Sequence, residues 1–470
     1  MAVTLSEIPV GFQGEGAGVG ELTWGQMNIW RATLRNDRTM NLAFPVPLPD
    51  GASLSDVAGM LRLMVSGHPA LRTRLRFVDG PSGSRHPQQV VAASGEVPLQ
   101  VLDVGDGDDP AAAAEELRSR YELTWFDYEN EFPVRMGVVR QSGVPVHLVV
   151  CHSHVMVDGG GLNILYQDFG QVSRATGEAA GPAGGPSPLE LASRQGSAAG
   201  RRQSERAIQY WAAQLDRLTA WQQAEPAPQD APRFAELSVY SAAMELGTRA
   251  VAARTGADAM SVLLAAYAAA VARVLGRDPG VALVAVNNRF RPGLAGMVSQ
   301  VAQHGICVVD VGDAGFDEVV ARAKKAMTSA SFYSYYDPVA WDRLLDEIAV
   351  RRGRPLDLYW WINDLRGMAG TADGDGGVPT EAELARVLPL TTLSWSPETP
   401  RSHGTLFFFV ASRPERFGGP PSAEDLPGIY MRVWADTEHF ALGQVEALVQ
   451  TMEAVVVAAA FDARAVASHG

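Results

Sequence analysis

Residues 133–161 read PVRMGVVRQSGVPVHLVVCHSHVMVDGGG and contain the most informative pattern in the chain. It contains two runs rich in β-branched residues, 133–140 and 144–151. Between them lies Ser142-Gly143, a pair typical of a tight turn between antiparallel strands. The stretch therefore predicts a β-hairpin.

The hairpin runs directly into residues that can carry chemistry. His154 follows the second run, Asp158 comes four residues later, and Gly159 opens a run of three glycines before helical spacing resumes over 162–172. A neutral imidazole can accept a proton near pH 7, the carboxylate can brace the turn, and glycines permit close approach of a substrate. The alternative is a buried structural histidine, because an isolated HxxxD pattern recurs by chance.

The rest of the chain alternates between helical and strand patterns. Residues 53–65 predict an amphipathic helix that Ser53 and Asp56 cap and Gly67 ends. The other expected elements are helices at 260–274 and 442–460 and strands at 281–286, 305–311, 405–410 and 430–434.

Composition divides the chain into two α/β halves with a split near residue 190. Residues 176–203 are rich in Gly, Ala, Pro and Ser and predict a flexible linker. We therefore expect an N-terminal domain over 1–175 and a C-terminal domain over 204–470. A second loop, rich in Gly and Asp, is expected over 367–381.

Charge and cysteine content exclude several classes of protein. The 470-residue chain has a formal net charge of −14, which argues against nucleic-acid binding. Its two cysteines form no CxxC pair, so neither a structural zinc site nor a disulfide framework is expected. The first twenty residues lack the pattern of a signal peptide, and the apolar stretch 259–275 is too polar to span a bilayer. We expect a cytoplasmic protein that binds no membrane and no metal.

Seven short segments, together with the HxxxDG stretch, resemble the ordered motifs of the condensation domains of nonribosomal peptide synthetases. The stretch around His154 resembles their HHxxxDG signature, and the resemblance extends over residues 20–460. The other segments are Leu22-Thr23-Trp24-Gly25-Gln26 with Trp30, His68 to Arg74, Phe126-Asp127 with Phe132 to Arg135, Tyr210-Trp211, Asn288 to Pro292, Asp337-Pro338 with Trp341 and Leu344, and Trp434 to Thr437 with Phe440.

The resemblance implies a fold and a reaction. The fold would be two chloramphenicol acetyltransferase-like subdomains that form a V-shaped pseudo-dimer around a central tunnel. A peptidyl or acyl carrier protein would bind transiently and present an acyl group on phosphopantetheine, and a small-molecule amine or alcohol would accept it. His154 would position or deprotonate this nucleophile, and Asp158 would pair with Arg289. The chain would bind no cofactor of its own and would act as a free-standing monomer in natural-product biosynthesis.

The sequence departs from the family pattern in two places. Ser153 replaces the first motif histidine, and His152, two residues before His154, is expected on the same strand face, where it could compensate. The segment that resembles the family's GFFVNT motif carries Ser299, Gln303 and His304, which are expected near the tunnel. The acceptor side would then be unusual, or the activity lost.

Other functions stay open. A coenzyme A-dependent acyltransferase of the same superfamily is one alternative, and an inactive docking domain that recruits an oxygenase is another. An epimerase would need an EGHG motif, which the sequence lacks. Residues 184–191 (GGPSPLEL) superficially resemble a carrier attachment motif, but their flanks are too short for a carrier domain. If a separate carrier binds, we expect Arg201, Arg202 and Arg206 to contribute to its docking.

Overall fold

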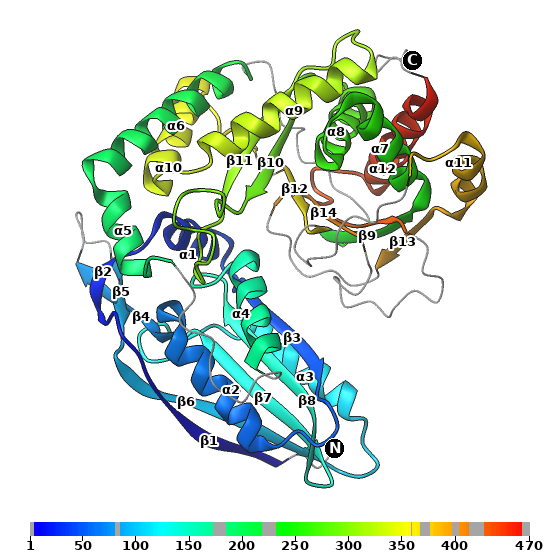
Figure 1. Ribbon diagram of the computed structural model, residues 1–470. Coiled ribbons are helices and arrows are strands. Elements are labelled where there is room, and N and C mark those ends of the chain that lie inside the picture. Colours follow the sequence, from blue (N-terminus) through cyan, green and yellow to red (C-terminus); the bar gives the residue numbers. More distant parts are fainter. Residues whose placement is uncertain are drawn as a thin grey trace. The chain divides into compact units, whose positions relative to one another are not determined.

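The protein divides into two compact units (Figure 1). Unit 1 comprises Met1–Gln203 and Asn287–Gln303, and unit 2 comprises Ser204–Val286 and His304–Gly470. Each unit is a mixed α/β fold, which confirms the expected fold class. The computed structural model describes residues 4–79, 85–172, 185–218, 232–358, 360–366, 377–396, 404–412 and 427–462.

Unit 1 contains two described sheets, with strand orders β1-β6-β7-β8-β3 and β2-β5-β4. Its strands are β1 (Thr4–Gln13), β2 (Gly18–Glu21), β3 (Asn41–Pro47), β4 (Thr73–Asp79), β5 (Arg85–Val91), β6 (Ser94–Val104), β7 (Val134–Gln141) and β8 (Val144–Ser153). Its helices are α1 (Trp24–Asn36), α2 (Leu54–Gly67), the 3-10 turn η1 (Pro69–Arg72), α3 (Pro110–Leu123), α4 (Gly159–Val172) and α5 (Pro188–Gly196). Helix α6 (Ala198–Asp216) begins in unit 1.

The larger sheet of unit 1 is covered on both faces. Leu148 and Val150 of β8 belong to the core that includes α2 and α4, and α2 crosses the near face of the sheet in Figure 1. Val149 and Cys151 of the same strand belong to the core that includes α3. Because successive strand residues point to opposite faces, the end of β8 can project side chains into both layers.

Unit 2 contains a mixed sheet with strand order β11-β10-β12-β14-β15-β9-β13. Its strands are β9 (Phe234–Ser241), β10 (Gly280–Val286), β11 (Gln303–Val309), β12 (Trp360–Asp364), β13 (Thr392–Ser396), β14 (Leu406–Ala411) and β15 (Ile429–Asp436). Its helices are α7 (Ala242–Thr255), α8 (Ala259–Leu275), α9 (Phe316–Tyr333), α10 (Pro338–Arg352), α11 (Glu381–Val387), the 3-10 turn η4 (Leu388–Leu390) and α12 (Leu442–Phe461).

The core of unit 2 lies between its sheet and helices α7, α8, α9 and α12. Of the single helices in the described ranges, α12 is long and apolar enough to cross a membrane; α7 and α8 pass the same test only as a pair, bent by 110°. Helix α12 packs against α7 and α8, and its apolar side chains Val445, Leu448 and Met452 are buried. Its composition is therefore that of a core helix.

The structure confirms the predicted helix cap at Ser53 and the predicted hairpin turn at Ser142-Gly143. Ser53 accepts a hydrogen bond from the backbone of Asp56, whose side chain accepts one in return, so the capping box of α2 is present. Ser142 and Gly143 have positive φ angles of 52° and 78°, the geometry that a two-residue hairpin turn requires. The other predicted helices and strands occur within a few residues of their expected bounds.

The prediction of a flexible linker over 176–203 is wrong for its second part. Helix α5 starts at Pro188, and Ser187 caps it in a box with Glu190; α6 then starts at Ala198. Leu191 and Ala192 are buried, so an apolar face orders this stretch despite its small-residue composition. Unit 2 starts at Ser204, the start expected for the C-terminal domain, although the coarse split was expected near 190; residues 287–303, expected in that domain, belong to unit 1. Residues 176–184, and 367–376 of the second predicted loop, lie outside the described residues.

Candidate functional site

His154 lies in a tight turn between β8 and α4. Strand β8 ends at Ser153, whose carbonyl accepts hydrogen bonds from the amides of Met156 at 3.0 Å and Val157 at 3.1 Å. His154 therefore projects from a turn and not from the strand. The expectation that His152 and His154 share one strand face is wrong, because the chain leaves the sheet between them.

The imidazole of His154 is held in one tautomer. Its Nδ1 lies 2.9 Å from the carbonyl oxygen of Val157. A carbonyl can only accept a hydrogen bond, so Nδ1 carries the proton and Nε2 keeps its lone pair. Burial lowers the pKa of His154, and the hydrogen bond to Val157 and the charge of Asp158 oppose that shift only in part. The ring is therefore neutral at pH 7, with Nε2 as a proton acceptor.

Asp158 and Arg289 form the predicted ion pair. Oδ1 of Asp158 lies 2.7 Å from Nη2 of Arg289, and the two side chains are only 2% and 10% exposed. The carboxylate also accepts hydrogen bonds from the backbone amides of Gly161 (2.7 Å), Val301 (2.9 Å) and Ala302 (2.8 Å). Both oxygens are thus fully used, which gives Asp158 a structural role and not that of a base.

The glycines of the motif make room for this ion pair. Gly159 opens α4. A methyl group on Gly160 would lie 2.4 Å from Nη1 of Arg289, and one on Gly161 would lie 3.3 Å from its Nη2. The guanidinium therefore packs against a backbone that has no side chains at these positions.

Arg289 lies in the segment Asn287–Gln303. This segment follows β10 of unit 2 in the sequence, but it belongs to unit 1. Besides Asp158, Arg289 donates hydrogen bonds to the carbonyls of Met297 at 2.9 Å and Ser299 at 3.2 Å. The segment is thereby tied to the histidine turn through the predicted ion pair, whereas its membership of unit 1 was not predicted.

The opening motif of the sequence contacts the same segment. A methyl group on Gly25 would lie 2.3 Å from the backbone oxygen of Gln300, so this glycine permits a close backbone approach. Thr23 caps α1 in a box with Gln26. These motif residues are therefore structural, as is Arg72, which is buried and donates hydrogen bonds to backbone carbonyls.

Ser153 has a partner that the sequence did not predict. Its hydroxyl lies 2.8 Å from that of Tyr128, and Ser153 is fully buried. His152 is also fully buried, but neither of its ring nitrogens has a hydrogen-bond partner in the described part of the chain. Burial and the nearby His68 lower the pKa of His152 to about 4. Tyr128, and not His152, is therefore the hydrogen-bond partner of Ser153, the residue that stands in place of the first motif histidine.

The three predicted tunnel residues lie in different surroundings. Ser299 is buried beside Arg289, and Gln303 is buried at the start of β11. His304 belongs to unit 2, where its ring lies edge-to-face against three aromatic rings at centroid distances of 5.4–5.7 Å: those of Tyr336, Trp341 and Trp361. A role for these residues in binding an acceptor stays a prediction.

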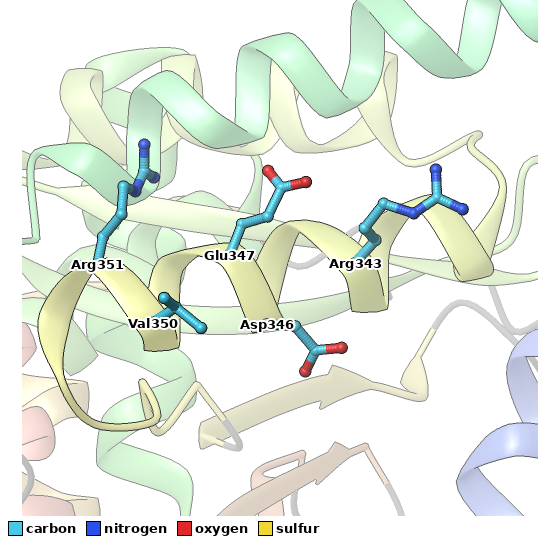
Figure 2. Close-up of a pocket in the computed structure, with 5 residues that line it drawn as sticks. All are labelled: Arg343, Asp346, Glu347, Val350 and Arg351. Atoms are coloured by element: carbon cyan, nitrogen blue, oxygen red, sulfur yellow. The ribbon is translucent and has the colours of Figure 1, made fainter.

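Two other features of unit 2 offer less chemistry. The ligand atoms of Asp436, Glu438 and His439 lie within 4.8 Å of one another, but Arg233 already pairs with both carboxylates, at 3.5 Å from Asp436 and 3.1 Å from Glu438. A shallow depression of about 470 Å³ lies on α10. Figure 2 shows the residues that line it, which are Val350 and four charged side chains of the same helix. Val350 is 82% exposed, so this depression is a solvated helix face.

The family model of the condensation domain matches residues 21–340, more than half of the chain. The chain belongs to the condensation domain family. The resemblance to condensation domains that was predicted from the sequence is thereby confirmed. The family acts in nonribosomal peptide and polyketide biosynthesis, and its general chemistry is acyl or peptidyl transfer.

Curated relatives of this condensation-family chain are large synthetases. It is 26% identical over 306 residues to the nonribosomal peptide synthetase kk1B of Curvularia clavata, which covers 61% of this chain and 2% of that protein. Cyclosporin synthetase simA of Tolypocladium inflatum is 28% identical over 57% of this chain and 2% of that protein. Enniatin synthase of Fusarium equiseti is 25% identical over a stretch that covers 70% of this chain and 11% of that protein. The chain thus spans about a tenth or less of the length of these relatives.

Solved structures share the fold at low identity. The first condensation domain of the CDA synthetase has a TM-score of 0.64 at 16% identity and covers 96% of this chain and 98% of its own. The X-domain from teicoplanin biosynthesis has a TM-score of 0.65 at 19% identity, with coverages of 95% and 96%. The condensation domain of the Monacolin K polyketide synthase MokA has a TM-score of 0.70 at 15% identity, and the match covers 96% of this chain and 99% of that domain.

Proposed function

We propose that this condensation-family protein transfers an acyl or aminoacyl group from a carrier-bound phosphopantetheine thioester to an amine or hydroxyl acceptor, with His154 as general base. The observation that carries the proposal is the tautomer of His154. The Nδ1–H group is bound to the carbonyl of Val157, so Nε2 is the basic atom. The lowered pKa keeps this atom unprotonated at neutral pH.

The proposed reaction needs one proton carrier. Nε2 of His154 takes the proton of the acceptor as its nitrogen or oxygen attacks the thioester carbonyl. The carbon–sulfur bond breaks, and the proton passes to the departing sulfur. The products are an amide or ester and the free phosphopantetheine thiol, so no metal or further cofactor is required. Asp158 takes no part in proton transfer because its oxygens are occupied by the hydrogen bonds described above.

The carrier would dock through local positive charge, since the net charge of −14 repels an acidic partner. Arg201, Arg202 and Arg206 are all exposed on α6, and Arg202 and Arg206 lie one turn apart on one helix face. Reversing both charges (Arg202→Glu with Arg206→Glu) should raise KM for an acyl carrier without changing kcat. Cytoplasmic location and a monomeric state stay predictions.

The experiment that tests the proposal follows the donor directly. Candidate carrier proteins loaded with acyl groups are incubated with the chain and with amines or alcohols, and intact-mass spectrometry records loss of the acyl mass. Turnover that His154→Ala abolishes supports the proposal. Equal efficiency with the same acyl group on coenzyme A would instead favour the coenzyme A-dependent reading, for which the C8-CoA complex of the rhizomide starter condensation domain provides a structural parallel.

A docking domain without activity is the second candidate. The observation in its favour is the structural likeness to the teicoplanin X-domain, which was also solved in complex with OxyB. If the chain is such a domain, the wild type and His154→Ala should bind a partner protein with equal affinity, and neither should transfer an acyl group from any donor.

A further inference from the structure

The residue directly before His154 is held by a tyrosine from another part of unit 1. The hydroxyls of Tyr128 and Ser153 lie 2.8 Å apart and share a hydrogen bond. Ser153 is fully buried and Tyr128 is partly buried against the same core, so the hydroxyl of Ser153 has no access to bulk water as an alternative partner. We propose that Tyr128 is a positioning residue that acts on His154 through Ser153; this rests on the proposed role of His154 as base.

The segment that carries Tyr128 is fixed to strand β7. Arg135 of β7 donates hydrogen bonds to both carboxylate oxygens of Glu131, at 2.7 and 3.0 Å. The same guanidinium donates to the carbonyls of Thr124 and Trp125, each at 2.8 Å. A planar guanidinium with several donors can hold such a loop in one conformation. Arg135 therefore clamps the chain on both sides of Tyr128.

The ring and backbone of Tyr128 are also fixed. Its ring lies edge-to-face against Trp30 at 5.4 Å and at an angle to Phe126 at 6.1 Å. Its carbonyl accepts a hydrogen bond of 2.6 Å from the amide of Leu75. Tyr128 thus presents its hydroxyl from a rigid support, and loss of the hydroxyl alone would leave the ring contacts in place.

Ser153 transmits this support to the histidine. Its amide donates to the carbonyl of Pro133 at 3.0 Å, which ends the pairing of β8 with the start of β7. Its carbonyl accepts the two amides that form the turn, those of Met156 and Val157. The carbonyl of Val157 in turn receives Nδ1–H of His154. A shift of Ser153 would therefore change the hydrogen bond that selects the tautomer of His154.

The inference can be tested without a substrate. Protein labelled with ¹⁵N-histidine is titrated by NMR, and the signal of His154 among nine histidines is assigned from its absence in His154→Gln. Wild type should show Nδ1–H and a pKa below the usual value of about 6.5. In Tyr128→Phe we expect both tautomers and a pKa that rises towards that value, because the turn opens to solvent.

Tyr121→Phe is the matched control. Tyr121 is more deeply buried than Tyr128, and its hydroxyl donates a hydrogen bond of 2.7 Å to Oε1 of Gln100, which lies in β6 and not at the histidine turn. This variant should lose thermal stability but keep the wild-type His154 signal. Ser153→Ala removes the same bond as Tyr128→Phe without touching the ring, so it should give the same NMR change, and the double variant should add nothing.

The inference is overturned if Tyr128→Phe and Ser153→Ala both leave the tautomer and pKa of His154 as in wild type, whatever their melting temperatures. If Tyr128→Phe fails to fold, Ser153→Ala alone decides. Failure of the proposed function is a separate result: His154→Ala would retain turnover, while the NMR dependence of His154 on Tyr128 would stand.

Discussion

Replacing Asp158 by alanine should destabilise unit 1 far more than replacing an exposed carboxylate. The change leaves the guanidinium of Arg289 buried without its counter-charge, and it leaves the amides of Gly161, Val301 and Ala302 without their acceptor. Removing one partner of a buried ion pair costs about 3–5 kcal/mol. For domains of roughly 150–250 residues this corresponds to a fall in melting temperature of about 6–20 °C.

The assay is differential scanning calorimetry beside equilibrium unfolding in urea, with Asp103→Ala as the matched control. Asp103 pairs with Arg140 at 2.7 Å in the same unit, but the two side chains are 35% and 25% exposed. That pair should contribute about 1 kcal/mol or less. Asp158→Asn with Arg289→Gln completes a double-mutant cycle, in which the two changes should be strongly non-additive. Equal losses of stability for Asp158→Ala and Asp103→Ala would show that the buried ion pair contributes no more than an exposed one.

The remaining predictions concern acid and the motif glycines. Burial lowers the pKa of both His152 and His68 to about 4, below the unfolded value of about 6.5. These buried neutral histidines favour the folded state fully above pH 6.5, and their contribution to the free energy of unfolding is lost as the pH falls towards 4. Urea unfolding should show a loss of about 2 kcal/mol per histidine between pH 7.5 and 5, and His152→Phe should reduce that dependence; an unchanged pH profile would contradict the assignment. Gly160→Ala should abolish turnover and lower the melting temperature because its methyl group would meet Arg289 at 2.4 Å, whereas Gly11→Ala, with nothing within 4 Å, should do neither.

Elements with strong local signals could be predicted from the sequence. The capping box at Ser53 and the Ser142-Gly143 turn act over a few residues, so their chemistry is legible in the chain. The pairing of Asp158 with Arg289 came from the family resemblance, since 131 positions separate the two residues. Neither spacing nor composition could have supplied it.

Long-range packing decided what the sequence could not show. The Gly- and Ala-rich stretch after residue 187 folds as helices because Leu191 and Ala192 find a surface to cover, and composition alone does not reveal that surface. The hydrogen bond between Tyr128 and Ser153 depends on how a loop meets the end of a strand. The tautomer of His154 depends on one carbonyl three residues away, whose direction only the folded turn fixes.

The most direct test of the central claim is a single-turnover measurement of acyl loss from a loaded carrier, followed by intact mass, with wild type, His154→Gln and His86→Ala. His86 is an exposed histidine of the same unit that pairs with Glu21, so it controls for loss of an imidazole. General-base catalysis predicts that His154→Gln slows the chemical step by about 10²–10⁴-fold while His86→Ala retains the wild-type rate. A His154→Gln rate equal to that of wild type would contradict the account.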